Sequence, residues 1–126
     1  MQHLDAFTRA YLECALWSTN DESTPSGGEP LESRYSIDDL APETLENAIA
    51  DCKQFQADNA EAIAQWPSNS ARATAERAGY DFWLTRNHHG AGFWVGDWPN
   101  GDALTAAADM YGEIDLYVGD DGLIYN

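Results

Sequence analysis

Basic residues are scarce in this sequence. Six lysine and arginine residues face 22 aspartate and glutamate residues, so the formal net charge is −16 at pH 7, and Lys53 is the single lysine. Nucleic acids and anionic membranes bind proteins that neutralise phosphate with lysine and arginine, so this composition argues against direct binding of either. It favours a partner with a basic surface, while plain solubility or a salt-adapted proteome would also account for the acidity.

Cysteines and long apolar runs are few as well. The two cysteines, Cys14 and Cys52, lack the spacing of a metal site, and we expect them to be buried thiols in a reducing cytoplasm. Residues 1–17 contain acidic and amide side chains, but no basic leading segment and no long apolar run. A signal peptide and a membrane span are therefore not expected.

The hydrophobic residues, 44% of the chain, suffice for one core in a single domain of residues 1–126. Apolar residues three and four positions apart are typical of helices. Proline is common at the first position of a helix and glycine just after its end, so Pro42 indicates a helix start and Gly79 and Gly112 indicate helix ends. These signals predict helices over residues 3–17, 42–66, 70–78 and 101–111. Residues 18–34 are rich in Ser, Gly, Pro and acidic residues, which predicts a flexible loop.

The pattern changes after Gly79. Residues 80–86 are aromatic and alternate in polarity, and residues 92–95 repeat this pattern after a turn-like segment of Asn, His and Gly. This predicts a β-hairpin. A second hairpin is predicted from residues 113–118 and 123–126, joined by a tight turn. The expected fold is α+β, with a helical N-terminal half and then a small, mostly antiparallel sheet (hairpin, helix, hairpin) backed by helices.

The tryptophans of this region have two expected roles. Trp83 and Trp94 stand in the facing strands of the predicted first hairpin, and helix-backed sheets favour aromatic core residues there. Trp98 lies beside Pro99 in an acidic loop, so we expect it to be exposed and to be a candidate binding anchor.

His88 and His89 suggest a metal or acid–base site. Adjacent histidines on a strand point to opposite faces, and no third ligand stands at a recognisable spacing. We therefore predict that both lie at the hairpin tip, with no metal and no cofactor. Asp81, inside a predicted strand, either faces solvent or, if buried, needs Arg86 or a tryptophan N–H as its partner.

The C-terminal half carries a recognisable motif. The segment AGYDFWLTRNHHGAGFW, followed by GDALTAAADMYGEIDLYVGDDGLIY, resembles a family of small bacteriophage and prophage proteins with the motif G-[HY]-D-F-W-L-T-R-N-[GH]-H-G-A-G-F-W-D. Tyr80 and His88 fill its variable places, Val95 stands where an acidic residue is usual, and the resemblance covers about residues 70–126. It implies a phage gene expressed in a bacterial cytoplasm, and it supplies no catalytic residues. By analogy, small acidic phage proteins are often inhibitors of host defence, such as anti-restriction and anti-CRISPR proteins.

Two functions follow as hypotheses. The first is a non-enzymatic inhibitor in the host bacterial cytoplasm, which binds a host protein through its basic or nucleic-acid-binding surface. Its predicted contact residues are Glu43, Glu46, Asp51, Asp58, Glu61 and Trp98. The less favoured alternative is a small enzyme or small-molecule binder in which Arg86 holds an anionic group and a histidine transfers a proton. Its polar cluster would contain Asp81, Arg86, His88, His89 and Asp97.

Overall fold

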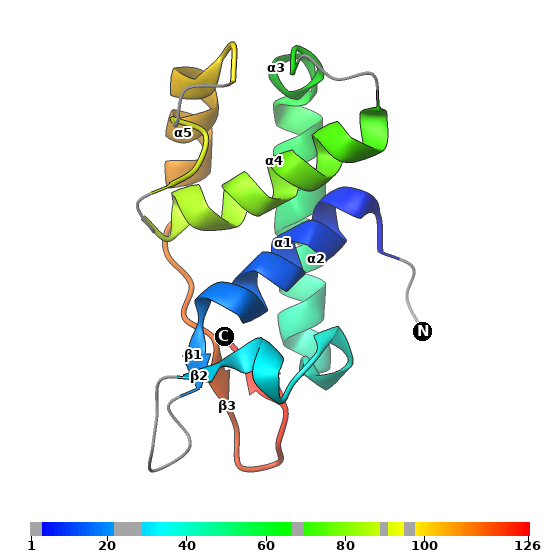
Figure 1. The fold of residues 1–126 in the computed structure, drawn as a ribbon, viewed down its shortest axis with the longest axis vertical. Helices are drawn as coiled ribbons and strands as arrows, with labels where there is room; N and C mark the ends of the chain where they lie inside the picture. The colour runs from blue at the N-terminus through cyan, green and yellow to red at the C-terminus, as the bar shows by residue number, and fades with distance from the viewer. Residues whose placement is uncertain (1–3, 22–28, 67–69, 89–90, 95–97) are drawn as a thin grey trace.

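The computed structural model describes residues 4–21, 29–66, 70–88, 91–94 and 98–126 (Figure 1). Its elements are, in chain order, α1 (Ala6–Ser18), β1 (Asn20–Asp21), β2 (Glu29–Pro30), η1 (Leu31–Ser33), η2 (Ile37–Asp39), α2 (Pro42–Asp58), α3 (Ala60–Ala64), α4 (Ala71–Arg86), α5 (Gly101–Asp109), β3 (Tyr117–Val118) and β4 (Ile124–Tyr125). β1 pairs with β2 and β3 with β4, both antiparallel. The predicted α+β class, with a helical N-terminal half and a small antiparallel sheet, is confirmed.

The first two predicted helices form, with one correction. α1 begins after Asp5, whose carboxylate accepts a hydrogen bond from the Thr8 backbone N–H at 2.8 Å and so caps the helix. The predicted helix over 42–66 is divided at Asn59 into α2 and α3. Asn59 leaves the helical conformation, and its side-chain amide donates to the carbonyl oxygen of Phe55 at 3.0 Å. The Asn59 backbone N–H donates to the same carbonyl at 3.0 Å, so the side chain adds a second donor where α2 ends.

The predicted first hairpin is wrong, because residues 80–86 form the second half of α4. Gly79 does not end a helix; it lies where α4 crosses α1, and a Cβ atom at this position would overlap the carbonyl oxygen of Phe7. Figure 1 shows α1 and α4 side by side across α2. All residues from Asp81 to Arg86 are buried, so the segment has no exposed face whose period would identify a helix. Residues 92–94 are bend and turn, and residue 95 lies outside the described residues.

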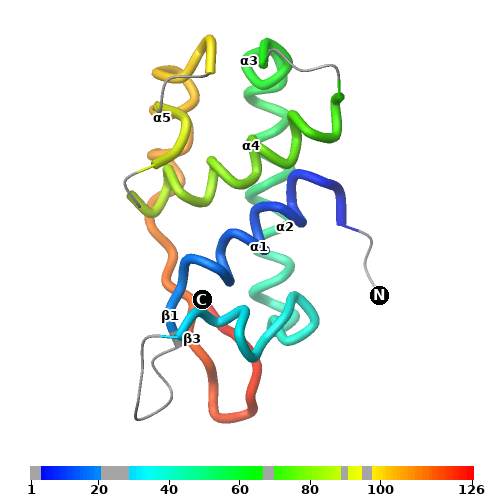
Figure 2. Tube along the Cα trace, in the orientation of Figure 1, coloured from blue at the N-terminus to red at the C-terminus, as the bar shows by residue number. Residues whose placement is uncertain are grey.

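The predicted second hairpin is confirmed in shorter form. Tyr117 pairs with Tyr125 and Val118 with Ile124, and the turn between them closes through a 3.0 Å hydrogen bond from Gly122 N–H to the Gly119 carbonyl. The Ala41 N–H donates to the Ile124 carbonyl at 2.9 Å, which ties the C-terminal strand to the start of α2. Figure 2 shows the C-terminus returning to this end of the molecule.

The other segments are placed as follows. Within the predicted flexible loop 18–34, β1 pairs with β2 and η1 follows directly, so these described parts are regular structure and the loop prediction is wrong for them. Residues 22–28 lie outside the described part of the chain. No helix among the described residues is both long and apolar enough to cross a membrane.

The core lies where α1, α2 and α4 cross. Phe55 of α2 stacks on Phe82 of α4 with ring centroids 4.2 Å apart, and Tyr11 of α1 packs against Phe82 and Trp83. Trp83 is buried, as predicted, and its indole N–H donates to Ser18 Oγ at 2.7 Å. Each such buried ring stabilises the fold by about 2–3 kcal/mol. Trp94, by contrast, is 42% exposed, so the prediction that it belongs to the core is wrong.

Candidate functional site

Asp81 is buried in α4, where its carboxylate accepts hydrogen bonds from a basic and an aromatic side chain. Its Oδ2 accepts from Arg77 Nε at 3.0 Å and from the Trp98 indole N–H at 2.7 Å. A buried carboxylate needs such donors, and a tryptophan N–H was one of the two partners that the sequence suggested. The expected exposure of Trp98 is wrong: only 6% of this residue is accessible. Trp98 therefore links the loop before α5 to α4, and its indole is not available as an exposed anchor.

Arg86 is the most highly connected cation of the described chain. Its Nη1 donates to Asp51 Oδ2 at 2.9 Å and to the Tyr11 hydroxyl at 3.1 Å, while Nε and Nη2 donate to the carbonyls of Gly112 and Tyr111. The guanidinium also lies over the rings of Phe82 and Tyr111. This geometry uses the planar fork of arginine to join α1, α2, α4 and the end of α5.

His88 follows the C-terminal end of α4 with a positive φ of 54°. Its Nδ1 lies 2.7 Å from Glu113 Oε1 and its Nε2 lies 3.3 Å from Asp109 Oδ1. The hydrogen bond with Glu113 raises the pKa of His88 above its ordinary value, because the carboxylate favours the protonated ring.

The members of the alternative polar cluster have separate surroundings. Asp81 accepts from Arg77 and Trp98, Arg86 donates to Asp51, and His88 lies beside Glu113, while His89 and Asp97 lie outside the described residues. Five positions apart on one helix, Asp81 and Arg86 point to different sides of α4. Within the described part of the chain, no group of three or more His, Cys, Asp or Glu side chains is arranged to hold a metal ion.

The acidic residues predicted to face a partner lie on α2 and α3. Glu43, Glu46 and Glu61 are exposed, and Asp58 is exposed while accepting from the Gln54 amide at 2.9 Å. Asp51 differs, because its carboxylate turns inward to Arg86 and its side chain is 33% exposed. Part of the predicted surface therefore serves the fold.

A groove between α1 and α4 was not identified from the sequence. Trp17 is 51% exposed, and its ring centroid lies 6.2 Å from that of Tyr80. The hollow has a volume of about 650 Å³. The residues that line it are Ala10, Glu13, Cys14, Trp17, Glu32, Glu76, Arg77 and Tyr80. The available signal was a tryptophan on the polar side of the predicted helix 3–17, one turn after Glu13.

Burial raises the pKa values of two residues that line the groove, Cys14 and Tyr80. It raises the pKa of the Cys14 thiol to about 12, so the thiol stays protonated near neutral pH and is a poor nucleophile. Burial also raises the pKa of Tyr80, which therefore stays neutral. The groove therefore offers uncharged aromatic rings and three carboxylates beside one arginine, Arg77, whose charge is paired with Asp81. Aromatic rings together with an excess of carboxylates suit cation binding.

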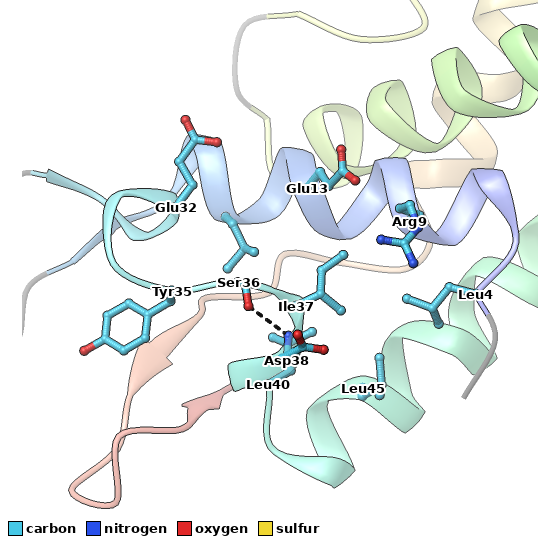
Figure 3. Close-up of a pocket in the computed structure, with 11 residues that line it drawn as sticks. Leu4, Arg9, Glu13, Glu32, Tyr35, Ser36, Ile37, Asp38, Leu40 and Leu45 are labelled. Atoms are coloured by element: carbon cyan, nitrogen blue, oxygen red, sulfur yellow. Dashed lines mark hydrogen bonds between the residues drawn. The ribbon is translucent and has the colours of Figure 1, made fainter. Parts of the chain in front are cut away.

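A second hollow of about 530 Å³ lies on the other side of Glu13 and Glu32 (Figure 3). It is bounded by α1, the η1–η2 segment and the start of α2. Its aliphatic side chains are Leu4, Leu16, Ile37, Leu40 and Leu45, and its charged ones are Arg9, Glu13, Glu32 and Asp38. Glu13 and Glu32 thus line both hollows.

No protein-family model, no curated protein and no solved structure matches this chain.

Proposed function

We propose that this protein is a phage-encoded, non-enzymatic inhibitor of host defence, of the anti-restriction or anti-CRISPR kind. It acts in the bacterial cytoplasm by covering the basic, nucleic-acid-binding surface of a host protein. The resemblance of residues 70–126 to small phage and prophage proteins supports the phage context, and the acidity of the chain supports a basic partner.

The main support is that most of the few basic side chains are paired with carboxylates of the same chain. Four arginines pair with carboxylates of the same chain: Arg34 with Glu29, Arg72 with Glu76, Arg77 with Asp81 and Arg86 with Asp51. With a net charge of −16, the surface keeps a large excess of carboxylates. A basic surface on the partner would attract these carboxylates and so speed association. The bound protein would then exclude nucleic acid from the same basic surface.

Two parts of the acidic surface are available for this role. One is the exposed side of α2 and α3, with Glu43, Glu46 and Glu61. The other is formed by Glu13 and Glu32, which line both hollows. Among the described residues, no cation lies within ion-pair distance of Glu13 or Glu32.

The proposal is tested by asking whether the protein protects an infecting phage from a bacterial defence system. The protein is expressed in bacterial strains that each carry one active restriction or CRISPR system, and the efficiency of plaquing of a sensitive phage is measured. We expect plaquing to rise in at least one strain. The purified target should bind the protein, with association slowing by about tenfold or more between about 0.05 M and 0.5 M NaCl.

Charge variants provide the control. Glu43→Lys with Glu46→Lys should weaken the inhibition, whereas Asp115→Lys with Asp120→Lys makes the same charge change at exposed positions near the C-terminal hairpin. Equal loss in both variants would indicate a response to net charge without a defined surface. Plaquing that stays unchanged in every strain, with no basic partner retained at low salt, would contradict the proposal.

A further inference from the structure

We infer that the groove between α1 and α4 receives one arginine side chain of the basic partner, with the guanidinium on the Trp17–Tyr80 rings and its N–H groups on Glu13 and Glu32. This inference rests on the proposed function and names the contact that would give it specificity.

The aromatic surface is the first reason. Seven of the 15 aromatic residues are buried, whereas Trp17 is 51% exposed. Its ring and that of Tyr80 are inclined by 35°, with centroids 6.2 Å apart, and both residues line the same hollow. An exposed tryptophan face is the best aromatic partner for a cation, and the planar guanidinium stacks on it.

The charges around the rings are the second reason. Three carboxylates, Glu13, Glu32 and Glu76, line the groove. Glu76 has Arg72 at 3.9 Å, but both side chains are at least half exposed, so this ion pair contributes little and can exchange. Glu13 and Glu32 keep their acceptor sites for an incoming donor, which suits a group with five N–H donors.

Arg77, which also lines the groove, is already engaged. Its Nε donates to Asp81 at 3.0 Å, and its guanidinium carbon lies 5.8 Å from the centre of the Trp66 ring. The chain thus already contains an arginine held between a tryptophan face and a carboxylate. The groove presents a second tryptophan, Trp17, and further carboxylates, Glu13 and Glu32. The planar guanidinium can stack on the ring and donate to both carboxylates, which favours it over an ammonium group as the ligand.

The test uses the capped peptide hexa-arginine, with hexa-lysine and hexa-citrulline as comparisons. The indole N–H signal of Trp17 in a ¹⁵N spectrum is assigned from a Trp17→Phe variant and followed during titration. We expect a saturating shift with hexa-arginine, a weaker one with hexa-lysine and none with hexa-citrulline, which is uncharged. Trp17→Ala should weaken hexa-arginine binding by about tenfold, the factor expected for a partly desolvated cation–π contact.

Matched variants separate the groove from general charge attraction. Trp94→Ala removes another exposed tryptophan, and Asp115→Asn with Asp120→Asn removes two other exposed carboxylates. Both should bind hexa-arginine like the unaltered protein, whereas Glu13→Gln with Glu32→Gln should bind it as weakly as Trp17→Ala. The inference is overturned if all variants weaken equally, or if hexa-lysine shifts the Trp17 signal as strongly as hexa-arginine.

The two proposals fail separately. If Trp17→Ala folds and still protects phage fully, the groove is not the contact and the proposed function stands. If hexa-arginine binds the groove and no defence system is inhibited, the cation site stands and the anti-defence role does not.

Discussion

At the scale of single residues, the polar side chains of α4 are more important for the fold than for chemistry. Asp81 is enclosed by Arg77 and Trp98, and Arg86 is enclosed by Tyr11, Asp51 and the carbonyls at the end of α5. Removing one member of such a buried group leaves its partners without hydrogen bonds, which costs more than the pair itself contributes.

Arg86→Met should therefore lower the free energy of unfolding by about 3–5 kcal/mol, because it leaves Asp51 and two carbonyls without donors. Asp51→Asn should cost less, about 2 kcal/mol, because the amide oxygen can still accept from Arg86, although the buried guanidinium loses its carboxylate. Urea unfolding followed by circular dichroism measures both. An Arg86→Met protein as stable as the unaltered one would show that the cage around Arg86 does not stabilise the fold.

At the scale of elements, the crossing of α1 and α4 depends on Gly79. In an isolated helix, alanine is more favourable than glycine by about 1 kcal/mol. Here the added methyl group would meet the backbone carbonyl of Phe7, which cannot rotate away as a flexible side chain would. Gly79→Ala should therefore destabilise the protein by about 3 kcal/mol or more, by forcing the two helices apart.

Gly112→Ala is the control for this variant. Position 112 has a positive φ of 76° but nothing within 4 Å of an added Cβ, so its cost should be only about 1 kcal/mol of backbone strain. Thermal unfolding of the two variants compares them. If Gly79→Ala raised the melting temperature, helix propensity would outweigh the crossing, contrary to the packing described above.

The ends of α4 and α5 are joined by His88, which lies between Asp109 and Glu113. Because its pKa is raised in the folded state, its stabilising effect is fully present below the pKa of the unfolded chain and is lost as pH rises through the folded value. The difference in melting temperature between the unaltered protein and His88→Gln should therefore be largest near pH 5.5 and shrink toward pH 8.5. A difference that grows with pH would contradict this ion pair.

At the scale of the whole molecule, the net charge of −16 acts in opposite directions on folding and on binding. Repulsion among the carboxylates opposes the compact state, and salt screens it, since the Debye length falls from about 10 Å at 0.1 M to about 3 Å at 1 M. Added NaCl should raise the melting temperature by several degrees while it weakens the complex with a basic partner. A melting temperature that falls with salt would show that attractive surface pairs, such as Arg34–Glu29, outweigh the repulsion.

The sequence by itself determined those elements that have one apolar and one polar side. The stripe from Leu4 to Leu16 is enough to identify α1, Pro42 marks the start of α2, and Gly101 and Gly112 bracket α5 with its short C-terminal extension. The terminal hairpin follows from two apolar strands around a turn of Gly and Asp. The excess of carboxylates, and the kind of partner it favours, also needs no structure.

Only the tertiary structure decided the helical conformation of residues 80–86 and the burial of Trp98. A segment buried on every side loses the periodicity that separates helix from strand, and Asp81 to Arg86 are all buried. What makes this segment helical is contact with distant residues: Phe7 against Gly79, Phe55 on Phe82, and Asp51 with Tyr11 around Arg86. The same long-range packing buries Trp98 and leaves Trp17 exposed. Whether an aromatic side chain is buried depends on which distant segment packs against it, and the local sequence does not specify that segment.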